Sequence, residues 1–156
     1  MGNIKVDFRE LEKFAKDLEK IRDKELQKVI EKTVKEIAAR FLAKVIKRTP
    51  VDKGTLRRGW TAGSNSNASA FIDSIQVNKI GNVYEITISN NVEYAVYVEY
   101  GHRQEVGRFV PAIGKRLKKS WVEGKFMLTK SEIEIKGQMD KIIAKNIDTW
   151  LKEVFG

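Results

Sequence analysis

The chain has 156 residues, of which 42% are hydrophobic and 33% are charged, and its formal net charge is +9. This length and hydrophobic fraction suit one globular domain over residues 1–156, and they exclude a disordered chain, which pairs high charge with few apolar residues. Because there is no cysteine and a single histidine, His102, disulfides and thiolate metal sites are excluded. A His-pair metal site, or a Ser–His–Asp system with a spare histidine, is nearly excluded.

The N-terminal residues predict no targeting signal. Residues 1–5 lead into a charged amphipathic segment without the apolar stretch of a signal peptide, and Val6 stands where a myristoylation signal needs Ser or Thr. No apolar run approaches the length of a transmembrane helix. We therefore expect no membrane contact and a protein made in a reducing cytoplasm.

The first 48 residues predict a mainly helical N-terminal part. Apolar residues alternate over residues 4–8, which predicts a short strand or an extended arm. An apolar stripe then predicts a first helix over about residues 9–21, with Asp7 and Glu10 at the spacing of a capping box. A second stripe, over residues 26–46, predicts a second helix. Between the two stripes the phase is lost, which favours two helices with a tight break and leaves one bent helix as the alternative.

Residues 49–88 predict loops and a hairpin. Pro50 disfavours helical geometry at the preceding residue and so ends the second helix. Residues 50–60 are loop-like, and the small, polar residues 62–70 predict a mobile loop, because they cannot bury enough surface to become ordered. Period-two alternation over residues 75–77 and 84–88 then predicts a β-hairpin with a Gly-Asn turn at residues 81–82.

The segment from residue 94 to 100 is apolar except for Glu99, so it should be buried. We favour a short helix, in which tyrosines and valines stack four residues apart, over a strand. This segment closes a β-rich core over residues 71–101. Residues 102–126 predict a basic arm, as an extended loop or a protruding hairpin, with six cations: Arg103, Arg108, Lys115, Arg116, Lys118 and Lys119.

The last element is a helix over residues 129–155. Thr129 and Glu132 have the capping-box spacing, and Met127 and Leu128 are available for a hydrophobic staple. Its apolar residues are Ile133, Met139, Ile142, Ile143, Ile147, Trp150, Leu151 and Val154. The order of helices, a small antiparallel sheet, a basic loop and a helix predicts an α+β fold.

The segment that follows the second helix is dense in turn chemistry. Pro50 fixes the exit angle of the helix, Asp52 can accept backbone amides in an Asx-type turn, and Gly54 allows a backbone conformation that other residues resist. Arg57 and Arg58 then lie on a loop, within reach of carboxylates on a neighbouring subunit.

Glu99 is the one charge in its apolar segment. Burying it alone would cost several kcal/mol, so it needs a partner, and Arg57 or Arg58 is the candidate, across the core or across a subunit boundary. The alternative is an exposed Glu99 on a half-buried helix.

Three segments together resemble one protein family: Thr49–Trp60, Asn90–His102 and Gly124–Leu128. Their order and spacing are similar to those of the neck, head–tail joining or tail-completion proteins of tailed phages, and the C-terminal part is most similar to PBSX-like prophages with contractile tails. The first two segments are fairly specific as a pair. Two departures are Lys53 where the family usually has Thr, and Gly59 where it usually has Ser before the aromatic residue.

The resemblance implies a structural subunit that forms a homo-oligomeric ring, often of six copies, in the neck or collar of a virion. Its partners would be other neck, connector, tail-terminator, sheath or tail-tube proteins, with DNA passing without sequence-specific binding. The residues expected to form the structural motif or the interface are Pro50, Asp52, Gly54, Leu56, Arg57, Arg58, Trp60, Tyr94, Tyr97, Glu99, Gly101, His102 and Trp121. Among the tryptophans, Trp150 is expected in the core, and Trp60 and Trp121 as interface anchors.

No cofactor, metal site or catalysis is predicted. His102 has no Ser, Cys or second His placed as a partner, so a turn hydrogen bond is its expected role. The strongest rival function is nucleic-acid binding, motivated by the charge of +9 and the basic arm, although no recognition helix or fold signature is visible. A prophage toxin or regulator is a third hypothesis, disfavoured because no nucleophile, metal site or phosphate loop is found.

Overall fold

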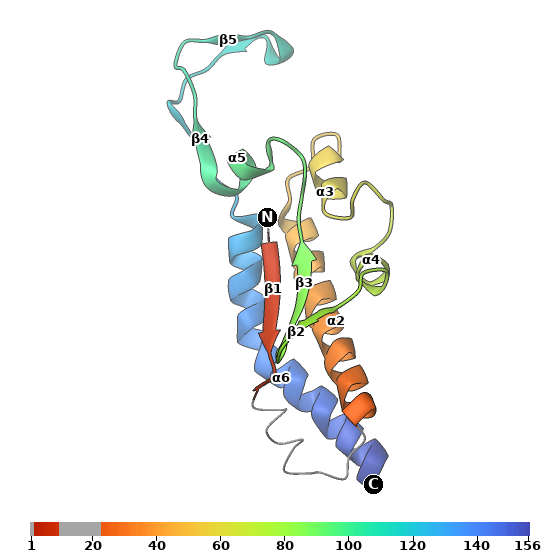
Figure 1. The fold of residues 1–156 in the computed structure, drawn as a ribbon. Coiled ribbons are helices and arrows are strands. Elements are labelled where there is room, and N and C mark those ends of the chain that lie inside the picture. Colours follow the sequence, from red (N-terminus) through yellow and green to blue (C-terminus); the bar gives the residue numbers. More distant parts are fainter. Residues whose placement is uncertain (1, 10–22) are drawn as a thin grey trace.

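The computed structural model describes residues 2–9 and 23–156, and they fold around two long helices that lie side by side (Figure 1). These are α2 (Asp23–Arg48) and α6 (Met127–Phe155). The other helices are α3 (Thr55–Gly59), α4 (Ala68–Asp73), α5 (Ala95–Tyr100) and the 3-10 turn η1 (Pro111–Ile113). The strands are β1 (Gly2–Asp7), β2 (Asn78–Ile80), β3 (Val83–Ile88), β4 (Gly101–Arg103), β5 (Phe109–Val110), β6 (Lys115–Arg116) and β7 (Trp121–Glu123). The α+β class is confirmed.

Helix α2 forms because its apolar residues recur every three or four positions and give one buried face. Fully buried side chains on this face include Val34, Ile37 and Val45. The helix ends at Arg48, two residues before Pro50, as predicted. The predicted first helix, its capping residue Glu10 and the choice between a break and a bend lie outside the described residues.

The sheet of β1, β3 and β2 is antiparallel and packs against α2 through β3. The alternating residues of β1 face the core, because Ile4 pairs with Ile86 and Val6 with Tyr84, and all four are buried. The predicted opening strand and the Gly-Asn hairpin are therefore confirmed. The first hairpin strand begins at Asn78, so the apolar residues 75–77 precede it.

Helix α6 begins two residues earlier than predicted, and its core face matches the predicted apolar stripe except at the two ends, where Ile133 and Val154 are exposed. Ile135, Ile142 and Trp150 are buried, and Trp150 is in the core as expected. Ile133, which we assigned to the apolar stripe, is 68% exposed. That assignment was wrong, because Ile133 lies two residues before Ile135 and points about 200° away from it around the helix.

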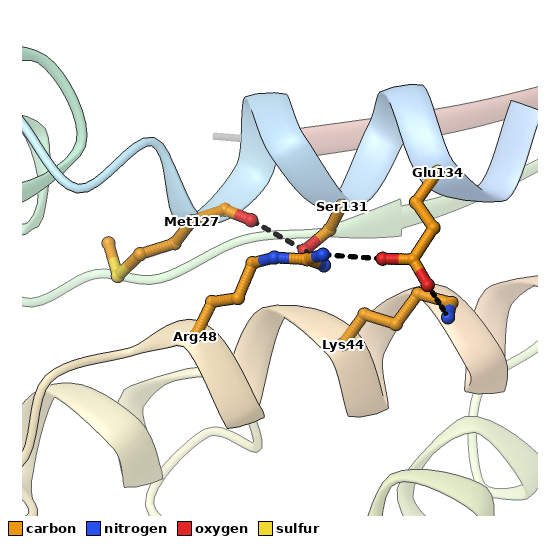
Figure 2. Close-up of polar contacts among 5 residues, drawn as sticks. All are labelled: Lys44, Arg48, Met127, Ser131 and Glu134. Carbon is orange, nitrogen blue, oxygen red and sulfur yellow. Dashed lines mark hydrogen bonds and ion pairs between the residues drawn. The ribbon is translucent and has the colours of Figure 1, made fainter.

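Polar side chains join α2 to α6 along one seam, which Figure 2 shows. Lys44 and Arg48 of α2 both form ion pairs with Glu134, and Arg48 also donates to the Ser131 hydroxyl at 3.1 Å. Hydrogen bonds from Lys44 and Arg48 lower the pKa of Glu134 to about 2. Farther along, the Asn146 amide donates to the Thr33 hydroxyl at 3.1 Å. The two helices are thus held in register by specific polar contacts as well as by apolar packing.

The expected mobile loop over residues 62–70 is shorter than predicted, because α4 begins within it. Asn67 caps this helix, its side-chain oxygen accepting from the Ala70 amide at 2.8 Å, and Ile72 is fully buried against the core. One apolar anchor just past the polar run, together with a favourable cap, is enough to order the segment.

Residues 101–124, here called the arm, form a hairpin that projects from the body (Figure 1). β4 pairs with β7 at its base, and β5 pairs with β6 near its far end. Of the two predicted forms, the protruding hairpin is the one observed.

Candidate functional site

The end of the body next to the arm brings the two specific sequence segments together. Residues 50–60 were expected to be a loop, but Thr55–Gly59 form helix α3, which Gly54 precedes with a left-handed φ of 78°. Leu56 points into the core. A glycine at residue 54 suits this conformation, as expected.

The two arginines of α3 and the tryptophan after it bind within the body. Arg57 donates to the Thr49 carbonyl at 3.0 Å and Arg58 to the Lys53 carbonyl at 3.3 Å, so both arginines serve the turn that they follow. Trp60 is fully buried, and its indole N–H donates to the Thr49 hydroxyl at 2.8 Å. The expectation that Trp60 is an interface anchor was wrong, because it locks α3 onto the end of α2.

Asn90 joins the two segments, a role that the sequence analysis missed. Its amide donates to the Leu56 carbonyl at 2.7 Å, and its oxygen accepts from the Val92 amide at 3.1 Å. A Cβ atom on Gly59 would lie 2.2 Å from the Asn90 oxygen. The glycine at residue 59, where the resemblance leads one to expect Ser, therefore allows the close approach of Asn90.

Glu99 is fully buried, and its partner is the start of helix α6. Its carboxylate accepts from the backbone amides of Leu128 at 2.9 Å and Thr129 at 3.0 Å, and from the Thr129 hydroxyl at 2.8 Å. The predicted pairing with Arg57 or Arg58, and the alternative of an exposed glutamate, were both wrong. Free amides and the positive end of the helix dipole stabilise a carboxylate without a cationic side chain. Glu99 thereby takes the capping role that we assigned to Thr129.

Helix α5 forms as preferred, and its outer side exposes a row of apolar and aromatic side chains. Tyr97 and Tyr100 are each 57% exposed, and Tyr94 and Val96 are nearly as open. Their exposure contradicts the expectation that this segment is buried on nearly every side. Because aromatic side chains are enriched at interfaces, this row is a candidate contact surface.

A groove of about 310 Å³ runs beside α5 and is here called the α5 groove. Seven of the expected residues line it: Pro50, Asp52, Gly54, Leu56, Tyr94, Tyr97 and His102. Val51, Val98 and Val122 extend its apolar lining. Arg57, Arg58, Trp60, Glu99, Gly101 and Trp121 do not line the groove.

The base of the arm depends on two glycines that face each other. Gly101 has a left-handed φ of 83°, and a Cβ atom there would lie 2.4 Å from the Val122 carbonyl oxygen. A Cβ atom on Gly124 would lie 2.4 Å from the Glu99 carbonyl oxygen. Trp121 contacts this base and is 41% exposed. The close backbone approach fixes the direction in which the arm leaves the body.

His102 lies on β4 between the groove and the arm. Its ring meets the Tyr97 ring edge-on, with centroids 5.7 Å apart. We expected His102 to make a hydrogen bond within a turn. Its Nδ1 atom does not do so, because it is buried and has no hydrogen-bond partner among residues 2–9 and 23–156. The Asx-type turn at Asp52 is not formed either, because none of the described residues donates to its exposed carboxylate.

The described part of the chain offers no assembled metal centre. No group of three histidine, aspartate or glutamate side chains there comes together to hold an ion. In the same part of the chain, no helix is long and apolar enough to cross a membrane.

The comparison with protein families gives a match over more than half of the chain. The family model HK97-gp10-like, described as "Bacteriophage HK97-gp10, putative tail-component", matches residues 12–101. The chain belongs to this family. The resemblance to phage tail and neck proteins is confirmed at that level. Comparison with the curated proteins and with the solved structures gave no match.

The range shared with the HK97-gp10-like family covers the first specific sequence segment and all of the second except His102, and it ends where the arm begins. It includes α2, α3, α4, the β2–β3 hairpin and α5. The segment Gly124–Leu128, the rest of the arm and α6 lie beyond it. The walls of the α5 groove from residues 50–56 and 94–98 thus belong to the family range, and the arm is attached directly to its last residue, Gly101. As a member, the protein is a structural component of a phage-type particle.

Proposed function

We propose that this HK97-gp10-like protein forms a homo-hexameric ring at the neck or collar of a phage-type particle. There it joins the head to the tail or terminates the tail tube, and its role is structural and not catalytic. The proposal takes the tail-component family as its basis and adds the ring and the position. Its partners are other copies of itself and the connector, tail-terminator, sheath or tail-tube proteins that meet it.

The observation that carries the proposal is the arm. It stands clear of a body whose core is complete without it, and it exposes large apolar side chains: Val106 at 57%, Phe109 at 50% and Ile113 at 60%. An isolated two-stranded hairpin is marginally stable in water, and exposed apolar side chains of this size are covered in an assembly. The arm therefore suits a subunit that is completed by its neighbours.

A closed ring fits the energetics of a small chain. Each copy contributes a modest contact, and a head-to-tail arrangement that closes leaves no unsatisfied end. Such a ring also leaves a central passage through which DNA can pass without sequence-specific binding. Assembly takes place in the bacterial cytoplasm, and the product is a part of the virion. The C-terminal resemblance to PBSX-like prophages supports a contractile tail.

Nucleic-acid binding through the arm is the second candidate. Residues 101–124 contain six lysines and arginines but only two glutamates, so the arm is basic. Arg103 lies opposite Trp121 in the β4–β7 ladder, and Arg116 lies opposite Phe109 in the β5–β6 ladder. Cations beside aromatic rings are typical of surfaces that bind phosphates and stack on bases. Retention of duplex DNA that falls steeply with salt would favour this function, since each phosphate contact adds to the salt slope.

Deletion of the gene in the phage or prophage that produces the particle tests the proposal. We expect electron micrographs to show separate heads and tails, or tails of uncontrolled length, and plasmid-borne wild-type protein to restore joined particles. Normally joined particles from the deletion strain would contradict the neck role. A deletion strain whose particles are joined but lack packaged DNA would favour the nucleic-acid alternative.

A further inference from the structure

The α5 groove has the chemistry of a site for an apolar segment. Its lining includes Pro50, Val51, Leu56, Val98 and Val122, and Tyr94 and Tyr97 form its outer wall. Val51 is 55% exposed and Tyr97 57% exposed, so the groove is open to solvent. In the described part of the chain no side chain fills it. Apolar lining with a few polar groups at the edge is the usual composition of a binding groove.

The same chain carries an apolar segment that is exposed in the described part of the structure. Phe109 and Ile113 lie at the far end of the arm, on β5 and on η1, where Pro111 stiffens the turn between β5 and β6. The ladder between β5 and β6 includes Phe109 and closes the turn that carries Ile113. A preorganised segment loses little conformational entropy when it binds, which favours its use as a docking element.

The arm cannot enter the groove of its own molecule. Val122 and Glu123 of β7 line the groove and pair with β4, so the base of the arm is itself one wall. From that wall the arm leads away from the body, and its far end lies at a distance from α5 and α3 (Figure 1). An arm that enters this groove must therefore come from another molecule.

Unpaired charges of opposite sign lie near the two surfaces. Asp52 and Glu123 lie on the rim of the groove, and Arg108 and Lys115 flank the apolar end of the arm. None of these four has an ion-pair partner in the part of the chain that the structure describes. The lining also includes Lys53 and Lys125, so the groove has no net charge of its own and its apolar side chains are the main feature for binding.

We propose that the arm of one copy docks Phe109 and Ile113 into the α5 groove of a second copy of this chain. The inference rests on the proposed ring and names its contact. Arm and groove are different surfaces, so the contact is head-to-tail, and it continues from copy to copy until the ring closes. Asp52 and Glu123 of one copy then lie near Arg108 and Lys115 of the next.

Disulfide cross-linking tests this contact directly, because the chain has no native cysteine. In the double variant Val51→Cys/Ile113→Cys, one cysteine is in the groove and one at the arm end. We expect mild oxidation to give a ladder of covalent oligomers that ends at the number of copies in the ring. The matched control is Val51→Cys/Ile80→Cys, because Ile80 is also exposed, at 69%, but lies on the β2–β3 hairpin. The control should remain uncross-linked.

The outcomes separate the docking contact from the ring itself. If mass measurement shows a ring but the double-cysteine variant gives no ladder, or the same ladder as the control, the docking contact is overturned and the ring stands. A wild-type protein that stays monomeric overturns both. Phe109→Ser/Ile113→Ser should be a folded monomer, and rings of wild-type mass from this variant would also overturn the contact. If this variant forms intact rings but no longer binds duplex DNA that the wild type binds, the end of the arm would be a DNA-binding surface instead.

Discussion

The carboxylate of Glu99, on α5, caps the start of α6 by accepting from the Thr129 amide at 3.0 Å and the Thr129 hydroxyl at 2.8 Å. The contact joins the end of the family-matched range to a helix that lies beyond it. It also spans the base of the arm, which leaves the body between α5 and α6. The position of the arm therefore depends on a carboxylate that is fully buried.

Replacement of Glu99 should destabilise the fold. Glu99→Ala leaves buried amides at the start of α6 without an acceptor, so we expect it to lower the free energy of unfolding by about 2–3 kcal/mol. Glu99→Gln keeps one acceptor oxygen and should have a smaller effect. Denaturation by urea, followed by circular dichroism, measures both. Lys118→Ala, on the arm, is the control and should leave stability unchanged; equal stability of Glu99→Ala and this control would contradict the capping role.

The indole of Trp60 should contribute to stability through one hydrogen bond and its packing. Trp60→Phe removes the donor to the Thr49 hydroxyl and leaves a small void, so we expect a loss of about 1–2 kcal/mol. Trp121→Phe, on the exposed arm, is the matched control and should unfold like wild type while it weakens self-association. If Trp121→Phe cost more stability than Trp60→Phe, the assignment of the two side chains to interface and core would be reversed.

Substitutions at two glycines of the arm distinguish the cost of backbone strain from the cost of a steric clash at the base of the arm. Gly101 and Gly107 have similar positive φ angles, 83° and 87°, but only at Gly101 would a Cβ atom meet a neighbour, the Val122 carbonyl oxygen. Gly107→Ala should cost about 1 kcal/mol from strain alone. Gly101→Ala should cost more and also abolish ring formation, because the arm must change direction. Thermal unfolding and mass measurement of both variants check this, and rings of normal mass from Gly101→Ala would contradict it.

The seam between α2 and α6 should depend on acidity through Glu134. Its pKa is lowered to about 2 by Lys44 and Arg48, below the value of 4.5 for an unperturbed glutamate. The unfolded chain therefore binds a proton at higher pH than the folded one, and the stabilisation present above about pH 4.5 is lost as the pH falls toward 2. Wild type should be more stable than Glu134→Gln at pH 6, and this difference should shrink at pH 3.

Glu132→Gln is the control for that experiment, because Glu132 pairs with Lys136 one turn away on the exposed face of the same helix. Its difference from wild type at pH 6 should be small, as is usual for exposed ion pairs. A difference between wild type and Glu134→Gln that stayed constant from pH 6 to pH 3 would show that Glu134 does not act through its ion pairs.

Features of the fold that depend on neighbouring residues could be predicted from the sequence. The apolar period of α2, its end before Pro50, the turn at Gly81 and the short helix α5 all follow from such patterns. The α+β class followed from the order of the predicted helices and strands. Ile133 was misassigned because several phases fit a helix as long as α6, and only the packing against α2 selects one.

Features that depend on contacts distant in the sequence could not be predicted. Glu99 required a partner, but charge alone suggested an arginine, whereas the free amides of a helix start 29 residues away supply the donors. Trp60 looked like an interface anchor because the loop before it gave no sign that it folds back onto Thr49. The role of Asn90 was missed, although Gly59 beside an aromatic residue was a signal that another group approaches closely there.

Mass measurement of the purified protein tests the ring most directly. Native mass spectrometry and sedimentation over a range of concentrations, with and without tail tubes, give the number of copies. We expect one closed species whose mass is a fixed multiple of 17.9 kDa, with six copies, and which persists on dilution. A species of 17.9 kDa at every concentration and in the presence of tail tubes would contradict the account.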